Sequence, residues 1–137
     1  MPPYPTKPEI EELCSALATS DTSPFFSRVS PNVTWDVMGT HPAAGHFTTL
    51  QAWKDGALGA VQTALDGPLA LKPTNVCGGG EQEWAAVELE ANATCKNGMP
   101  YNQRYVWMLR FDKSGTIVQA RAYLDSALVQ KAMVSNP

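Results

Sequence analysis

The sequence predicts an α+β domain in which helices cover one face of a curved antiparallel sheet. Two observations lead to this class. Apolar residues recur at helical spacing in the first half of the chain, and alternating β-branched segments separated by turn signals fill the second half. A chain of 137 residues has the length of one ordinary domain.

Helical signals dominate the first half of the chain. From about residue 8 to 19, apolar side chains at i, i+3, i+4 and i+7 predict an amphipathic helix that opens at Pro8. The proline-rich residues 1–7 are expected to be a loose N-terminal tail, so that 8–137 forms the single domain. Ser23 is a candidate cap for a short second helix through Phe25 and Phe26, and a third helix is expected after Thr48 or Thr49.

Strand signals begin with the alternating segment 32–38 and then fill the chain from about residue 68. The four strands predicted there form an antiparallel meander, at 69–77, 83–95, 101–111 and 116–124. Between the second and third of them, Asn97-Gly98 is the strongest short signal for a β-hairpin. The last segment, 125–131, is expected to be a helix for which Asp125 is a suitable N-cap.

Composition argues against several functional classes. Ten basic and thirteen acidic residues give a net charge of −3 without a basic stripe, so a nucleic-acid partner is not expected. The apolar runs are too short to span a bilayer, and no membrane association is expected. Three cysteines without a CxxC pair and only two histidines argue against a disulfide framework and a metal centre. The N-terminus lacks the pattern of a signal peptide, which favours a cytoplasmic protein.

The hairpin register predicts which side chains share a face of the sheet. If Asn97 and Gly98 are the two turn residues, one face carries carboxylates among large aromatic side chains. The cross-strand pairs expected on it are Thr94–Tyr101, Asn92–Gln103, Glu90–Tyr105 and Glu88–Trp107. Helices over this face would bury the carboxylates and raise their pKa, which makes a pocket able to move protons near neutral pH. If the face is exposed instead, the two glutamates are a solvated edge.

The last strand determines how much room such a pocket has. A four-residue turn at 112–115 places Ala120 and Ala122 beside the large aromatic side chains and leaves space for a ligand. A bulged turn would reverse the parity and bring Arg121 and Tyr123 to the same face. Both alternatives are compatible with the sequence.

Several segments resemble a known family. The run 36–45, DVMGTHPAAG, is similar to a loop of ketosteroid isomerases and SnoaL-like polyketide cyclases, which belong to the NTF2-like superfamily. The stretches 109–111, 115–118 and 121–125 are similar to the end of the same fold. The resemblance implies an NTF2-like cone, in which a curved sheet wraps around the N-terminal helices and encloses an apolar pocket. It also implies a homodimer through the outer sheet face, where Val87, Leu89, Val106 and Met108 need cover.

The resemblance implies acid–base roles for two aspartates. Asp36 falls where ketosteroid isomerases have the general base that shuttles a proton between carbons. Asp125 falls where SnoaL-like cyclases have their acid–base aspartate, although the same residue is also a good helix cap. His41 lies close to Asp36 in the same loop, and its ordinary pKa of ~6.5 makes it a candidate proton shuttle.

The hydrogen-bond donors of the isomerases are changed in this chain. Trp107 falls where the isomerases have a protonated aspartate that donates to the enolate oxygen, and Leu13 lies near the position of their donor tyrosine. Tyr105 or Tyr101 would therefore have to donate to that oxygen. This departure argues against classical steroid isomerisation.

These expectations predict a cofactor-independent isomerase, cyclase or dehydratase of secondary metabolism. Its substrate would be a small apolar carbonyl compound, polyketide- or terpenoid-derived, on which an aspartate removes a proton beside the carbonyl. The candidate catalytic residues are Asp36, Asp125, Tyr105 and His41, and the candidate substrate-binding residues are Trp107, Tyr101, Glu88, Glu90 and Gln103. The alternative is a non-catalytic module of the same fold that binds a ligand or dimerises.

Overall fold

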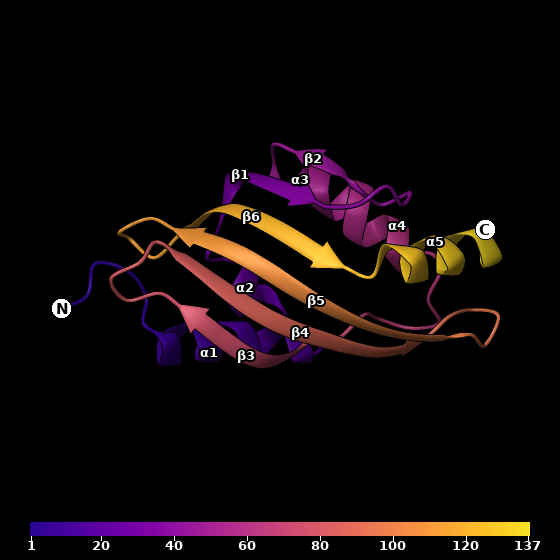
Figure 1. Cartoon of the computed structure of the whole chain (residues 1–137), viewed down its shortest axis with the longest axis horizontal. Helices are drawn as coiled ribbons and strands as arrows, with labels where there is room; N and C mark the ends of the chain where they lie inside the picture. Colours follow the sequence, from indigo (N-terminus) through magenta and orange to yellow (C-terminus); the bar gives the residue numbers. More distant parts are fainter.

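Six strands form one curved sheet, with helices packed against its inner face (Figure 1). The computed structural model describes all of residues 1–137. The strands are β1 (Val29–Val37), β2 (Gly45–Phe47), β3 (Lys72–Gly78), β4 (Trp84–Thr94), β5 (Pro100–Phe111) and β6 (Ile117–Leu124). This arrangement confirms the predicted α+β class and the four-stranded meander from β3 to β6.

The order of the sheet is β2-β1-β6-β5-β4-β3. Strand β1 runs parallel to β6, and every other neighbouring pair is antiparallel, so the sheet is mixed rather than wholly antiparallel. The short strand β2 lies between the strand predicted at 32–38 and the helix predicted after Thr48 or Thr49, where the sequence indicated no strand. Its three residues pair with the end of β1, and this pairing returns the chain toward the next helix.

The helical segments are α1 (Lys7–Ser15), η1 (Ala16–Ala18), α2 (Ser23–Phe26), α3 (Leu50–Trp53), η2 (Lys54–Leu58), α4 (Gly59–Gln62) and α5 (Ser126–Ser135). Helix α1 begins with a capping box, in which the Thr6 hydroxyl accepts from the Glu9 amide and the Glu9 carboxylate accepts from the Thr6 amide. Before it, Tyr4 and Pro5 share backbone hydrogen bonds with Gly80. None of the helices is long and apolar enough to cross a membrane.

The third helical region is interrupted by a π-helical turn. Thr49 caps α3 through the amide of Ala52, as the sequence predicted for Thr48 or Thr49. The π-helical turn η2, with hydrogen bonds between residues five apart, then continues the helix up to Leu58. A Cβ atom on Gly56 would lie 2.5 Å from the ring of Phe47, so the missing side chain permits the close packing of β2 against this turn.

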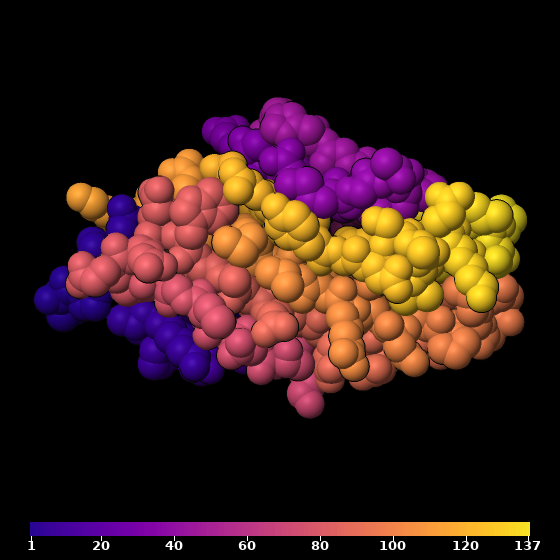
Figure 2. Space-filling model, in the orientation of Figure 1, coloured from indigo at the N-terminus to yellow at the C-terminus, as the bar shows by residue number.

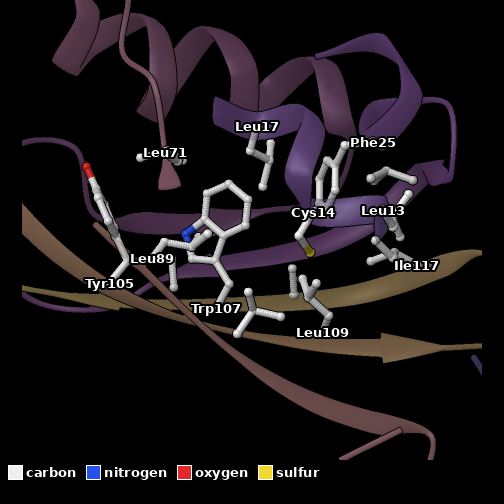
Figure 3. Packing of buried hydrophobic residues seen from close by; sticks show 14 of the residues in the cluster. Leu13, Cys14, Leu17, Phe25, Leu71, Leu89, Tyr105, Trp107, Leu109 and Ile117 are labelled. Atoms are coloured by element: carbon white, nitrogen blue, oxygen red, sulfur yellow. The ribbon is translucent and has the colours of Figure 1, made fainter. Parts of the chain in front are cut away.

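The core lies between the helices and the inner face of the sheet. Figure 3 shows Leu17, Cys14 and Phe25 reaching from the helical side toward Trp107 and Leu109 on β5. Twenty-five buried residues form this main cluster, and a second cluster of seven surrounds Tyr101 near α5. The inner face of β4 and β5 is therefore almost wholly apolar.

The β4–β5 register differs from the predicted one by a single residue. Cys95, not Lys96, pairs with Met99, and the amide of Cys95 donates to the Met99 carbonyl at 2.8 Å. The connection is therefore a three-residue loop that ends in Gly98 at a φ of +87°, as in hairpins with a glycine bulge. The slip exchanges the two faces of β4, because side chains alternate along a strand.

The exchange corrects two predictions. Val87 and Leu89 are buried in the core and do not belong to an outer face, while Glu88 and Glu90 point away from the helices. On β6 the predicted parity holds, but the register is moved by two residues: Ala122 pairs with Trp107, and Ala120 pairs with Leu109. Small side chains thus do lie beside the aromatic residues of β5.

Candidate active site

An apolar cavity lies between β5, β6, the η2–α4 region and α5. Its volume is about 50 Å³, which is room for a few water molecules. Fifteen residues line it, among them Val37, Ala57, Leu58, Val129 and Tyr105. His41 is the only lining residue outside the apolar and aromatic types, and no carboxylate takes part.

Two tyrosines of β5 place hydroxyl groups in this apolar surrounding. Tyr101 and Tyr105 are 0% and 8% exposed. Burial raises the pKa of Tyr105 well above its usual value, and the Tyr101 hydroxyl beside it raises this pKa further. Burial also raises the pKa of Tyr101. Both side chains are therefore neutral phenols near pH 7, which can donate hydrogen bonds to an oxygen that gains negative charge.

Trp107 follows Tyr105 on the same face of β5. It pairs with Ala122, and Figure 3 shows its indole nitrogen on the side of the ring that faces Tyr105. An indole N–H in this position is a third possible donor to a ligand oxygen. The predicted grouping of Tyr101, Tyr105 and Trp107 in one cavity is therefore what the structure shows.

Stacked aromatic rings fill the cone beyond Trp107. Trp35 stacks on Trp53 with ring centroids 3.7 Å apart, and the edge of this pair meets Trp107, 5.1 Å from Trp35. Phe25 and Phe26 extend the cluster. The indole N–H of Trp35 is buried without a hydrogen-bond partner. These rings fill the interior of the cone on one side of Trp107, and the cavity lies on the other side of it.

His41 is held by backbone groups on both ring nitrogens. Its Nδ1 accepts from the amide of Ala43 at 3.2 Å, so Nε2 carries the proton and donates to the carbonyl of Met38 at 3.0 Å. Burial lowers the pKa of His41, although the Met38 carbonyl opposes this shift. A neutral ring with both nitrogens engaged positions the loop at the cavity wall, and neither nitrogen is free to shuttle a proton.

Gln103 is fully buried beside the tyrosines, but its amide is used by the protein. The Nε2 group donates to the Asp125 carbonyl at 3.0 Å and to the Tyr101 hydroxyl at 3.4 Å. The Oε1 atom accepts from the amides of Asp125 and Arg104 at 2.9 and 3.0 Å. Gln103 therefore clamps the junction of β6 and α5 and orients the Tyr101 hydroxyl, rather than offering a free group to a substrate.

The two aspartates do not meet in the cavity. The Asp125 side chain is exposed, and its Oδ1 accepts from the Leu128 amide at 3.2 Å as the N-cap of α5. Asp36 alternates with Trp35 and Val37 on β1, so its side chain lies on the outer face, where it bonds to His46 of β2. Neither carboxylate lines the cavity.

The two glutamates also lie outside the cavity. Glu88 accepts from the side-chain amide of Asn75 at 3.0 Å on the outer side of β3 and β4. Glu90 pairs in register with Arg104 on the same face. The prediction that these residues are pocket acids depended on the two-residue turn, and the longer loop removes its basis.

The sequence did not indicate several residues that complete the cavity wall. Leu58, Leu69, Leu71 and Val129 come from four separate segments and bring only apolar surface. Leu58 and Val129 lie in helical segments that the sequence predicts, whereas Leu69 and Leu71 lie where it indicated a strand. Their meeting depends on the path of the chain between α4 and β3, which no local pattern fixes.

The comparisons with known proteins support this fold. A dimerizing cyclase, phiC, from Fungal sp. (strain ATCC 74256) is 29% identical over 134 residues, and a dimerizing cyclase, tstC, from Talaromyces stipitatus is 25% identical over 134 residues. Each alignment covers 97% of this chain and 59% of the relative, so the chain spans about three fifths of their length. No family model matches the chain.

Among solved structures, an NTF2-like protein from Burkholderia thailandensis superposes with a TM-score of 0.72 at 20% identity. The superposition covers 93% of this chain and 98% of that one. The chain therefore has the NTF2-like fold. Its curated relatives are cyclases, which confirms the resemblance to the SnoaL-like and ketosteroid isomerase-like branch of the superfamily.

Proposed function

We propose that this chain is a cyclase that binds a small, largely apolar carbonyl compound and joins two such molecules. Its curated relatives carry the name dimerizing cyclase, which supports this proposal. The observation that carries the proposal is an apolar cavity whose inner polar groups are neutral hydrogen-bond donors. Such donors stabilise charge that develops on a carbonyl oxygen.

The free thiols of all three cysteines favour a reducing compartment such as the cytoplasm.

In this mechanism a carbonyl oxygen accepts hydrogen bonds from Tyr105 and Tyr101, with the Trp107 indole as a further donor. Loss of a proton from the neighbouring carbon gives an enolate, whose carbon forms a bond to the carbonyl carbon of the second molecule. The π bond of that carbonyl breaks, its oxygen takes the electron pair, and the alkoxide then takes up the proton that the base removed. The phenols hold the oxygen charge among apolar side chains, where each hydrogen bond is stronger than in bulk solvent. Because no carboxylate lines the cavity, we assign proton removal to a base from solvent or from the substrate itself.

The aspartates have structural roles in this proposal. Asp125 caps α5, and Asp36 joins β1 to β2 through His46. The acid–base mechanism expected from the resemblance required both carboxylates in one cavity. The observed geometry favours orientation and oxyanion stabilisation by the tyrosines instead.

A ligand-binding module without catalysis is the second candidate. The lining of the cavity favours it, because none of the fifteen lining residues is a carboxylate that could act as a general base. The rings of Trp35 and Trp53 also occupy interior space that a larger ligand would need. In this alternative the tyrosines fix the orientation of a bound carbonyl compound, and no bond is made.

Exchange of α-protons separates the two candidates. We expect the protein to accelerate deuterium incorporation beside the carbonyl of 2-tetralone, an apolar bicyclic ketone, as followed by proton NMR in D₂O. Tyr105→Phe is expected to lower the acceleration by about 10²-fold, the usual effect of one lost oxyanion donor. Tyr123→Phe, on the outer face, is the matched control and should leave the rate unchanged. Binding without acceleration would support the module, and an unchanged rate in Tyr105→Phe would contradict the assigned donor.

We also propose a homodimer through the outer face of the sheet, which Figure 2 shows as a broad surface formed by β3 to β6. Apolar side chains lie there beside a cation–π contact, in which the Arg121 guanidinium lies 4.7 Å from the Trp84 ring. Val106 and Met108 are half-buried in the single chain. Sedimentation should give a dimer that Met108→Asp dissociates, and a monomeric wild-type protein would refute this interface.

A further inference from the structure

A groove lies directly outside the cavity, between η1, α2 and the segment 68–71. Its volume is about 350 Å³, which is within the usual range for small-molecule sites. Ala18, Thr19 and Ala70 line it but do not line the cavity. The groove is thus a separate space on the helical side of the molecule.

The groove and the cavity share one wall. Five residues line both spaces: Trp53, Leu58, Leu69, Leu71 and Trp107. Leu58 ends the π-helical turn η2, and π-helical turns occur often at functional sites. Trp107 belongs to both linings, so a molecule in either space would lie against this indole.

The lining of the groove fits a neutral ligand. None of its fourteen residues is charged, and nine are hydrophobic. The polar lining residues lie largely at the edge of the groove. The Nε2 group of Gln62 donates to the Gly67 carbonyl, and its Oε1 atom accepts from the Leu69 amide, so this side chain holds the 67–69 loop. The backbone amide of Leu71 donates to the Leu17 carbonyl at 2.9 Å and ties the same segment to η1. These hydrogen bonds fix the outer wall of the groove. Leu58, at the end of the π-helical turn η2, lies on the wall that the groove shares with the cavity.

We infer that the groove is the binding place of the second molecule of the same apolar carbonyl compound, which lies beside the first at the side chains that line both spaces. The inference rests on the proposed function, in which two molecules are joined. Because Trp107 lines both spaces, a molecule in the groove lies next to a molecule in the cavity. The neutral lining admits a ketone or lactone and offers no cation to hold a free carboxylate.

The test uses 2-tetralone and the backbone amides of the ¹⁵N-labelled protein. Ser20 and Ala70 report on the groove, and Ala57 and Val129 report on the cavity. We expect both sets of amide signals to shift during titration, with two different midpoints. Ala70→Trp fills the groove from an exposed position and is expected to raise the groove midpoint at least tenfold, while the cavity midpoint stays within about threefold. Ala18→Trp is a second blocking variant, and Ala127→Trp on the exposed side of α5 is the control.

Four other results overturn the inference in distinguishable ways. If only the cavity signals shift, the groove is not a binding place, while the proposed function stands. If both sets share one midpoint, a single molecule spans both spaces. If both blocking variants keep the wild-type groove midpoint, the ligand does not occupy the groove. If neither set shifts, the proposed binding of carbonyl compounds fails together with the inference.

Discussion

Removal of the Gln103 amide is predicted to destabilise the chain strongly. In Gln103→Met the side chain keeps its approximate volume but loses every hydrogen bond. The backbone N–H and carbonyl of Asp125 and the N–H of Arg104 then lose partners at 2.9–3.0 Å. Because Gln103 is 0% exposed, water does not replace it without a rearrangement of the β6–α5 junction.

The size of the effect follows from these three bonds. A typical intramolecular hydrogen bond contributes about 1 kcal/mol net, and an unsatisfied buried group costs about 1–3 kcal/mol. Since the partners are only part-buried, we expect a loss of about 3–5 kcal/mol in the free energy of unfolding. For a domain of this length, 1 kcal/mol corresponds to roughly 3–4 °C in Tm, so the expected fall is on the order of 10–15 °C.

Urea unfolding and calorimetry measure this loss. Gln119→Met is the matched control, because Gln119 is a glutamine of the same sheet that accepts one hydrogen bond, from the Arg110 guanidinium at 3.1 Å. The control should lose no more than about 1 kcal/mol. If Gln103→Met unfolds within 1 kcal/mol of Gln119→Met, the clamp does not stabilise the junction and the argument is refuted.

Two further predictions concern the cap of α5 and the buried phenols. Asp125→Ala should lower the free energy of unfolding by about 1 kcal/mol through loss of the N-cap and keep the rate of α-proton exchange within about threefold of the wild-type rate. A loss of exchange above tenfold with an unchanged free energy of unfolding would indicate a catalytic role for Asp125. The raised pKa values of Tyr101 and Tyr105 make the folded state hold protons that the unfolded state releases above about pH 10. These groups should therefore leave the free energy of unfolding unchanged below pH 10 and lower it above pH 10. In Tyr105→Phe the free energy of unfolding should fall less steeply as the pH is raised above 10. Equal slopes for the variant and the wild-type protein would contradict the assignment.

The fold could be predicted because its signals are local and repeat along the chain. The Ile10, Leu13 and Cys14 stripe marks α1, alternation marks β1, and Thr49 has the side chain of a helix cap. The resemblance added the cone, in which the curved sheet wraps around the helices. The parallel pairing of β1 with β6 joins segments about ninety residues apart, which no local pattern encodes.

The candidate site was predicted less completely, because a shift of one residue in strand register moves a side chain from one face of the sheet to the other. Asn97-Gly98 is the signal of a two-residue turn, but Gly98 also fits the last position of a three-residue loop, and the choice exchanges Glu88 and Glu90 for Val87 and Leu89. The tyrosines and Trp107 were placed correctly because both registers keep them on one face of β5. Asp125 shows the opposite difficulty, since one sequence pattern suits both a helix cap and a catalytic acid.

The carbonyl stretching frequency of bound 2-tetralone tests the central claim that neutral phenols hold a carbonyl oxygen in an apolar cavity. Infrared difference spectra of the wild-type complex should show the band at lower wavenumber than in hexane. The Tyr101→Phe/Tyr105→Phe variant should return it toward the hexane value, whereas Tyr123→Phe should not. A hexane-like band for ketone bound to the wild-type protein, or a band that the double variant leaves unmoved, would contradict the account.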